Sequence, residues 1–294
     1  MHNHWLLYLL LLIPVIYMFV FGYVPMTGLV MAFKKANLSQ GLYGGEWIGL
    51  KNFRDFFNGW TFWRLISNTV WISFSYLVLA FPFPVLLAIM LNESRSMAFR
   101  RTVQMVTYAP YFISTVVMVG IIMQMLSPYN GIINKFVVAL GGKPINFMGV
   151  PQYFVPIYVI SGVWQGMGYS AIVFIAALTN VNPELYEAAR IDGASKMGKV
   201  RYIDVPEIIP TAIIMFILNM GSVMNVGFEK IFLMRNDLNK TAADVISVYV
   251  YEQGVLKAKY GLSTAVGLFN SVINLSLVMF FNFVGKRVGD VSVW

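Results

Sequence analysis

Six long stretches of the chain contain no Asp, Glu, Lys, Arg or His. They are residues 5–33, 65–92, 102–134, 144–183, 208–228 and 260–285. Each is long enough to cross a bilayer, because about 20 apolar residues span the hydrocarbon core as a helix. Only 12% of the 294 residues are charged and 58% are hydrophobic, whereas about a quarter of the residues in a soluble domain are charged. The chain is therefore predicted to be an integral membrane protein.

These stretches predict an all-α fold, a polytopic membrane protein with a single transmembrane domain over residues 1–294. We place its six helices at about 5–33, 65–92, 102–126, 153–180, 207–228 and 261–285. Prolines within the stretches predict kinked helices, since proline cannot donate to the helical ladder. The first stretch has no basic flank and no small-residue cleavage site, so we expect a retained helix rather than a secretory signal.

Composition excludes several kinds of chemistry. The chain has no cysteine, and both of its histidines, His2 and His4, fall in the first four residues. Disulfides and thiolate catalysis are excluded, and a buried metal site would have no imidazole. We expect no catalytic residues, no metal and no cofactor in this chain. The net charge of +8 is scattered over the connecting segments, which favours contact with membrane lipid headgroups and not with nucleic acid.

Neutral polar side chains inside the apolar stretches are the candidate substrate path. An ion-coupled carrier normally buries ionisable groups near the midplane, and these stretches contain none. Amides and hydroxyls beside aromatic rings bind sugars, although the same groups also hydrogen-bond one helix to another. Close helix packing is the favoured role of Gly162, Gly166 and Gly168. The candidate path residues are Gln124, Gln165, Tyr169, Asn219, Asn270 and Asn274.

The polar segment 181–206, between the fourth and fifth helices, has strong helix punctuation. Asn182 suits an N-cap and Pro183 suits the first helical position. Gly193 offers a stop, and a second turn is predicted to begin near Ser195. The sequence therefore predicts a short helix from Pro183 to Asp192.

A helix this short needs another surface on which to bury its side chains. Ala188 and Ala189 permit close approach, while Glu184, Glu187 and Asp192 supply charge. This combination favours docking against a partner protein. The alternative is an interfacial helix lying on lipid, which the five acidic residues of 184–207, against four basic ones, disfavour. The run GASKMGKV that follows nearly matches a phosphate loop but has valine where the pattern needs a hydroxyl, so we do not expect ATP binding.

The same segment carries a family resemblance. Residues 187–189 (Glu-Ala-Ala), Gly193 and residues 203–206 (Ile-Asp-Val-Pro) resemble the signature cytoplasmic loop of permease subunits of bacterial ATP-binding-cassette importers. Val205 stands where that family usually has leucine. The longer run NPELYEAARIDGAS resembles the carbohydrate branch. The run WIGLKNF at 47–53 and both ends of the chain are similar to permeases for oligosaccharides and polysaccharide fragments.

The resemblance implies a transport subunit and not an enzyme: half of the translocation path of an ATP-driven carbohydrate importer in the bacterial cytoplasmic membrane. It implies a cytoplasmic coupling helix between helices four and five that sits in a cleft of an ATPase subunit. The implied partners are a second, homologous permease, two ATPase subunits that hold ATP and Mg, and an extracytoplasmic solute-binding protein. The implied coupling residues are Glu184, Glu187, Ala188, Ala189, Asp192 and Gly193.

Three alternatives stay open from the residues alone. They are an importer permease for a non-sugar solute, an ion-coupled secondary transporter, and a membrane enzyme acting on lipid-linked sugars. The membrane orientation is also nearly balanced, with nine Lys and Arg on the segments of one side and twelve on the other. The tight basic clusters at 95–101 and 286–287 favour their side, together with both termini, as cytoplasmic.

Overall fold

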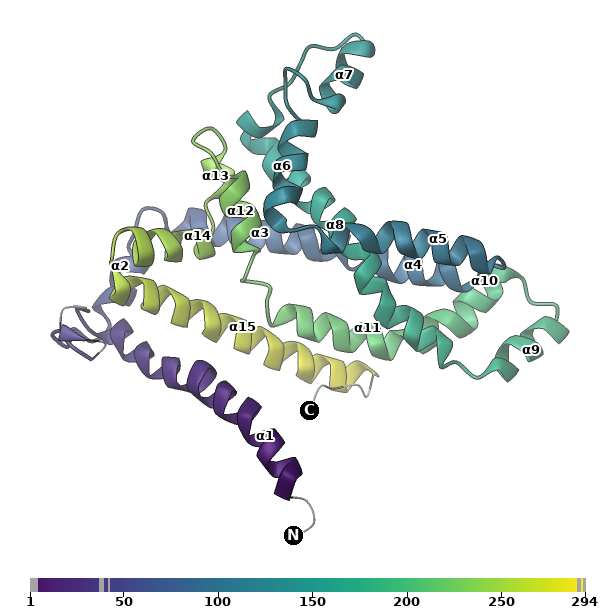
Figure 1. Ribbon diagram of the computed structural model, residues 1–294, viewed down its shortest axis with the longest axis horizontal. Coiled ribbons are helices and arrows are strands. Elements are labelled where there is room, and N and C mark those ends of the chain that lie inside the picture. Colours follow the sequence, from purple (N-terminus) through teal and green to yellow (C-terminus); the bar gives the residue numbers. More distant parts are fainter. Residues whose placement is uncertain (1–4, 37–39, 42, 290–291, 293–294) are drawn as a thin grey trace. The chain divides into compact units, whose positions relative to one another are not determined.

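The computed structural model describes residues 5–36, 40, 41, 43–289 and 292 (Figure 1). Both histidines lie outside these residues. Within them the regular secondary structure is helical, and the β-structure is one isolated antiparallel bridge between Lys34 and Trp47. The predicted all-α class is confirmed.

The described residues contain five helical segments that are long and apolar enough to cross a membrane, and a sixth candidate that is bent. The five are Leu7–Phe33, Phe62–Asn92, Pro151–Thr179, Lys196–Met220 and Tyr260–Arg287. The sixth consists of Met97–Phe112 and Thr115–Met125, which meet at 102°. These segments confirm a polytopic membrane protein. The stretch predicted as one helix over 102–126 is therefore two helices, and the break follows Pro110.

The chain divides into two compact units. The first comprises 1–63 and 248–272, and the second comprises 64–247 and 273–294. Whether the two act as the single domain expected for residues 1–294 stays a prediction.

The first unit begins with the most exposed span of the chain. Its apolar window within Leu7–Phe33 has no buried residue, as expected of a helix whose neighbours are lipid or another subunit. Phe56 is buried, and its ring makes edge-on contacts with Phe62 and Phe269. The elements of this unit are α1 (Trp5–Met18), a π-helix (Phe19–Tyr23), a 3-10 helix (Val24–Phe33), α2 (Lys51–Phe57), a π-helix (Glu252–Leu256) and parts of α14 (Ile246–Tyr251) and α15 (Tyr260–Gly289).

The second unit is built around α8, which packs against α4, α5, α11 and α13. Gly168 allows the close approach of α5, because a Cβ there would lie 2.1 Å from the carbonyl oxygen of Thr107. This agrees with the expected packing role of that glycine. The helices are α3 (Phe62–Ala80), α4 (Pro82–Asn92), α5 (Met97–Tyr108), α6 (Thr115–Met125), α7 (Ile132–Ala139), α8 (Pro151–Thr179), α9 (Pro183–Ile191), α10 (Lys196–Lys199), α11 (Val205–Met220), α12 (Phe228–Met234) and α13 (Lys240–Ala243).

The placement of four short elements in this unit positions the candidate sites described below. The chain passes from α7 into α8 and leaves α8 for α9, so α7 and α9 lie at opposite ends of α8 (Figure 1). The 3-10 turn Ala109–Phe112 and the short helix α12 lie beside the middle of the unit, where they help to form its cavities.

Candidate functional site

The short helix α9 begins as its sequence predicts. Asn182 is the N-cap, and its side-chain Oδ1 accepts a hydrogen bond from the backbone N–H of Glu184 at 3.0 Å. Pro183 occupies the first helical position, where its missing N–H leaves no bond unmade. Glu184 in the first turn and Arg190 in the last complement the helix dipole.

The end of α9 is a Schellman motif. The backbone N–H of Ala194 donates to the carbonyl of Ala189 at 2.9 Å, and that of Gly193 donates to Arg190 at 3.2 Å. Gly193 has φ +69°, a left-handed conformation that side chains with a Cβ rarely adopt. Asp192, the last residue before it, is the C-cap. The predicted stop at Gly193 is where the helix ends.

A polar contact attaches α9 to the ends of the spans. The hydroxyl of Tyr186 donates to Oδ1 of Asp204 at 2.6 Å. Asn92 at the end of α4 donates to both the Tyr186 oxygen and the same Asp204 oxygen, at 3.3 Å each. Asp204 is fully buried. Burial, followed by the hydrogen bond to Asp204, raises the pKa of Tyr186 to about 12, so the hydroxyl keeps its proton and remains a donor.

Two further contacts strengthen the attachment. Lys199 Nζ lies 3.1 Å from Oε1 of Glu93, which joins α10 to the residue just after α4. Ala189 and Tyr186 pack against a buried apolar cluster. The cluster consists of Ala88, Phe174, Leu178, Val181, Ile203 and Ile208. One side of α9 is therefore fixed to α4, α8 and the start of α11.

The other side of α9 is exposed. We call Glu184, Leu185, Glu187, Ala188 and Ile191 the docking face; all five are exposed, and Ile191 keeps 86% of its surface. Of the six predicted coupling residues, Ala189 is the one that turns partly inward. An exposed face that combines apolar side chains, a small residue and carboxylates on a fixed helix is suited to contact with another protein.

Two adjoining cavities lie within the second unit. One, of about 360 Å³, is bounded by α3, α4, α8, α11 and residues 222–227. The other, of about 470 Å³, is bounded by α3, α8, residues 111–115 and Lys230 of α12. They share Tyr76, Tyr158, Gly162 and Gly166. Both have mixed walls of aromatic rings, amides and hydroxyls, and neither has an acidic lining residue among the described part of the chain.

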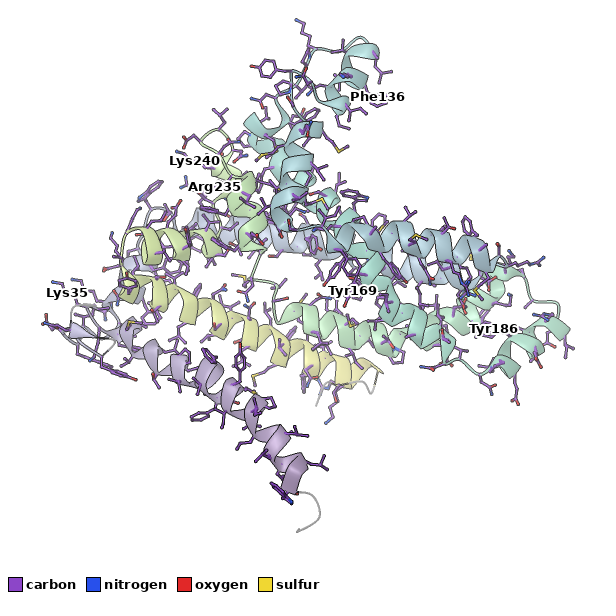
Figure 2. All side chains as sticks on the ribbon, in the orientation of Figure 1. Lys35, Phe136, Tyr169, Tyr186, Arg235 and Lys240 are labelled. Atoms are coloured by element: carbon purple, nitrogen blue, oxygen red, sulfur yellow. The ribbon has the colours of Figure 1, made fainter. Side chains whose placement is uncertain are left out.

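The six candidate path residues take different places. Asn219 lines the cavity of about 360 Å³, and Gln165 lines that of about 470 Å³, where its amide donates to the carbonyl of Ile113 at 3.3 Å. Tyr169 (Figure 2) stacks on Tyr111 with ring centroids 3.8 Å apart. The remaining three lie elsewhere: Gln124 is exposed on α6, Asn270 is half-buried in the first unit, and Asn274 is buried with its Oδ1 accepting from the N–H of Met224 at 3.0 Å. The bond of Asn274 is a packing contact that holds α15 to the turn after α11.

Sequence reasoning missed Lys230, which is only 8% exposed. Its ammonium donates to the backbone carbonyl of Tyr158 at 3.3 Å and lies 5.1 Å from the centre of the aromatic ring of the same residue. Burial lowers the pKa of Lys230 to about 8. The run FEKIFLM could have indicated this position, because Lys230 shares its helix face with Met234, which is fully buried.

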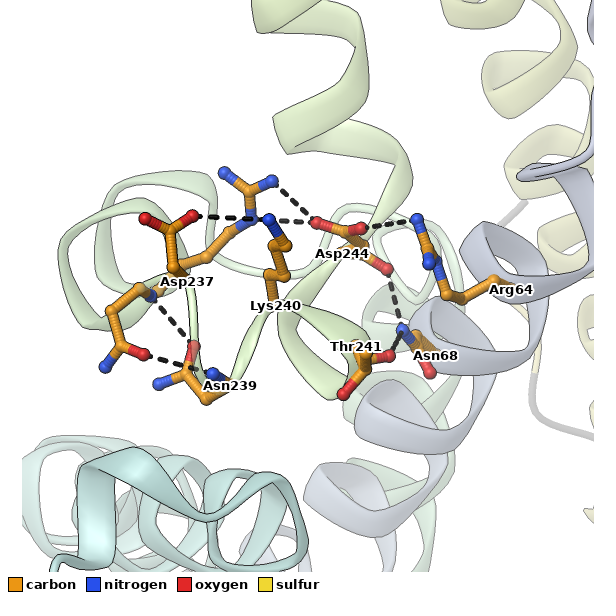
Figure 3. Close-up of polar contacts among 9 residues, drawn as sticks. Arg64, Asn68, Asp237, Asn239, Lys240, Thr241 and Asp244 are labelled. Carbon is orange, nitrogen blue, oxygen red and sulfur yellow. Dashed lines mark hydrogen bonds and ion pairs between the residues drawn. The ribbon is translucent and has the colours of Figure 1, made fainter.

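A polar network orders the segment that follows α12 (Figure 3). Asp244 accepts from two arginines: its Oδ2 lies 2.8 Å from Nη2 of Arg64, and its Oδ1 lies 2.8 Å from Nη2 of Arg235. The amide of Asn68 donates to the carbonyls of Thr241 and Asp244, at 2.9 and 3.0 Å. These contacts fix residues 235–244 to the start of α3.

The structure defines a polytopic helical membrane protein with a short, fixed and exposed helix between two of its spans. The chain belongs to the family of binding-protein-dependent transport system inner membrane components, whose family model matches residues 80–290. It is therefore an inner membrane component of a transport system and not an enzyme.

Close relatives cover nearly the whole chain. The polygalacturonan/rhamnogalacturonan transport system permease protein YteP of Bacillus subtilis is 38% identical over 98% of this chain and 90% of its own length. Protein LplB of the same species is 39% identical over 96% of this chain and 88% of its own. A chain from the crystal structure of a bacterial transporter that imports the acidic polysaccharide alginate is 38% identical, with a TM-score of 0.91 and coverage of 98% and 97%. A second structure of a bacterial alginate transporter, in complex with an alginate pentasaccharide-bound periplasmic protein, has a TM-score of 0.92 and 37% identity.

Proposed function

We propose that this chain is the permease subunit of an ATP-driven importer of oligosaccharides or polysaccharide fragments, and that it forms half of the translocation path. The observation that carries this proposal is the docking face of α9, exposed on one side and fixed through Tyr186 to Asp204 on the other. Membership of the transport family and the carbohydrate-related names of YteP and the alginate transporters support the substrate class.

In this proposal α9 is the coupling helix. Two ATPase subunits, which bind ATP and Mg themselves, close when nucleotide binds, and the cleft that holds α9 moves with them. Glu187 supplies a polar anchor, Ala188 permits close contact, and Gly193 sets the bend after the helix. Because Tyr186 and Ala189 join α9 to α4, α8 and α11, a displacement of α9 is passed to helices that line the cavity of about 360 Å³.

The remaining partners follow from the same proposal. A second, homologous permease completes the path, and an extracytoplasmic solute-binding protein delivers the sugar, as in the alginate complex with its periplasmic protein. Both termini and α9 are cytoplasmic, which is supported by the basic clusters at 95–101 and 286–287. Residues 235–244 then face outward, where the Asp244 network gives the binding protein a rigid surface to meet.

Purification from the native membrane tests the proposal. We expect a second permease and an ATPase to accompany this chain, and a screen of oligosaccharides with the solute-binding protein to stimulate ATP hydrolysis by the assembled complex. Uptake that survives ATP depletion but collapses with an uncoupler would instead indicate an ion-coupled carrier. Stimulation by peptides or amino acids and by no sugar would indicate a different importer.

A further inference from the structure

The cavity beside α12 is lined by neutral residues and one buried lysine. We call it the Lys230 cavity, and its walls include Tyr76, Tyr111, Tyr158 and Gln165. Lys230 is the single charged residue in the described lining. A charge on a side chain that is only 8% exposed is costly unless it is paired, so one buried cation among neutral groups needs a physical explanation.

The protein itself uses only part of the hydrogen-bonding capacity of this ammonium group. Lysine carries three N–H donors, and Lys230 Nζ makes one hydrogen bond among the described residues, to the Tyr158 carbonyl. The face of the Tyr158 ring adds a cation–π contact at 5.1 Å. No carboxylate of the described chain lies within ion-pair distance of Lys230, whereas Lys199, Arg64 and Arg235 each have one.

The rest of the lining provides what a sugar ring requires. Gln165 and the hydroxyl residues Ser114 and Thr115 offer donors and acceptors to sugar hydroxyls. Tyr111 provides a flat apolar surface whose orientation is held by its stack on Tyr169, with ring planes 3° apart. Aromatic faces of this kind pack against the C–H face of a saccharide.

Glycine keeps the space beside the ammonium open. A Cβ at position 162 would lie 3.5 Å from Lys230 Nζ and 2.6 Å from the ring of Tyr76. Any larger side chain at 162 would therefore displace Tyr76 and occupy the side of the cavity that Lys230 borders. The cavity is open at the cation because α8 has no side chain there.

We propose that the Lys230 cavity binds the carboxylate of an acidic saccharide, a uronic-acid oligosaccharide, during its passage through the permease. This inference rests on the proposed carbohydrate import and narrows its substrate class. The carboxylate accepts from the ammonium that the protein leaves partly unpaired, in a charge-assisted bond. The sugar hydroxyls meet Gln165 and the hydroxyl side chains, and the ring faces Tyr111. A neutral sugar would offer only hydroxyl acceptors and leave the cation unneutralised.

The test compares two ligands that differ only in charge. The probes are a short oligogalacturonate and the same oligosaccharide with its carboxyl groups reduced to primary alcohols. Binding is measured by equilibrium dialysis on the purified membrane complex without solute-binding protein, so that it reports on the membrane subunits alone. The variants are Lys230→Met, which keeps length without charge, and Lys230→Arg, which keeps charge.

We expect the wild-type complex to prefer the acidic probe by about tenfold or more, the usual scale of a hydrogen bond to a charged group. Lys230→Met should abolish that preference with little change for the reduced probe, and Lys230→Arg should retain most of it. Equal loss of both probes in Lys230→Met would identify a merely structural lysine and overturn the inference. A wild-type complex that binds both probes equally would overturn it without any variant.

The failure of this inference is distinguishable from failure of the proposed function. A complex that binds and imports neutral oligosaccharides but shows no preference for acidic ones remains a carbohydrate importer without the Lys230 site. A complex that responds to no saccharide of either kind, with ATP hydrolysis intact, contradicts the proposed function itself.

Discussion

The Tyr186 hydroxyl, on the short helix α9, donates to the fully buried carboxylate of Asp204 at 2.6 Å. The two residues are 18 positions apart and belong to different elements: Tyr186 is on the exposed helix, and Asp204 is the last residue before α11. Through this contact a force on the docking face would be passed directly to the start of a span. The other oxygen, Oδ2, has no hydrogen-bond partner among the described residues, so Tyr186 and Asn92 together provide the polar contacts of this carboxylate.

Replacing Tyr186 by phenylalanine should therefore weaken the attachment of α9 to the ends of the spans. Loss of a hydrogen bond to a buried carboxyl costs about 1–2 kcal/mol, so the thermal midpoint of the purified complex should fall and sugar uptake per ATP hydrolysed should decrease. Tyr202→Phe is the matched control, because Tyr202 lies in the same loop with 73% of its surface exposed. If both variants behave alike, the Tyr186–Asp204 contact carries no coupling.

Gly193 provides a second test, of whether the orientation of α9 is needed for transport. At φ +69° an alanine costs about 1–2 kcal/mol, which the short helix would avoid by losing its Schellman end and reorienting the docking face. We expect Gly193→Ala to assemble yet to import sugar several-fold more slowly. Gly198→Ala is the control, since a Cβ there meets only ordinary contacts at 3.5 Å or more. Full uptake by Gly193→Ala would show that the bend is not needed.

Local signals explain which features of α9 and the spans were predictable. Asn182 and Gly193 act on the backbone within a few residues, so the start and end of α9 could be derived from sequence alone. Apolar stretches are also local, because each span must be long and uncharged whatever its neighbours are. Pro110 indicated a kink in the third stretch, but the 102° angle depends on tertiary packing that no local pattern encodes.

Burial of charged groups could not be derived in the same way. Charged residues mark the ends of the apolar stretches, and this criterion places Lys230 in a connecting segment. Its burial depends on Tyr158, 72 positions earlier. Asp204 depends in the same way on Asn92, 112 positions away. For the candidate path, amide chemistry alone did not distinguish Gln165, which lines a cavity, from Asn274, which hydrogen-bonds the backbone of Met224.

The network at Asp244 should contribute to stability. Asp244→Ala would leave Arg64 and Arg235 without their shared carboxylate, and because these side chains are 22–33% exposed we expect a loss of about 2 kcal/mol, less than for a fully buried pair. The measurement is the thermal midpoint of the purified complex. Asp237→Ala is the control: Asp237 pairs with Lys240 but is 96% exposed, so its loss should change the midpoint little. Equal midpoints for the two variants would contradict a structural role for Asp244.

The lowered pKa of Lys230 predicts a pH dependence for acidic saccharides. The ammonium is charged below its pKa of about 8 and neutral above it, while a sugar carboxylate stays ionised throughout this range. Affinity for oligogalacturonate should therefore fall as pH rises through about 8, until it approaches the affinity for the reduced probe. The other titratable groups facing Lys230 are the phenols of Tyr76, Tyr111 and Tyr158.

The Lys230→Arg variant distinguishes titration of the lysine from titration of those phenols. An arginine stays protonated over this range, so the variant should bind oligogalacturonate with nearly constant affinity, and the reduced probe should show no pH dependence in either protein. Dialysis at a series of pH values measures both. If Lys230→Arg loses affinity over the same interval as wild type, a group other than Lys230 is titrating.

Site-directed cross-linking tests the central claim, that α9 docks into an ATPase subunit, most directly. The chain has no cysteine, so one introduced thiol reports on one position. A cysteine at Ala188, on the docking face, should cross-link to the ATPase subunit of the assembled complex through a short bifunctional reagent, and the yield should change when nucleotide binds. A cysteine at Leu140, which is 88% exposed beyond α7 at the opposite end of α8, should give no such product. A cross-link from Leu140 and none from Ala188 would contradict the account.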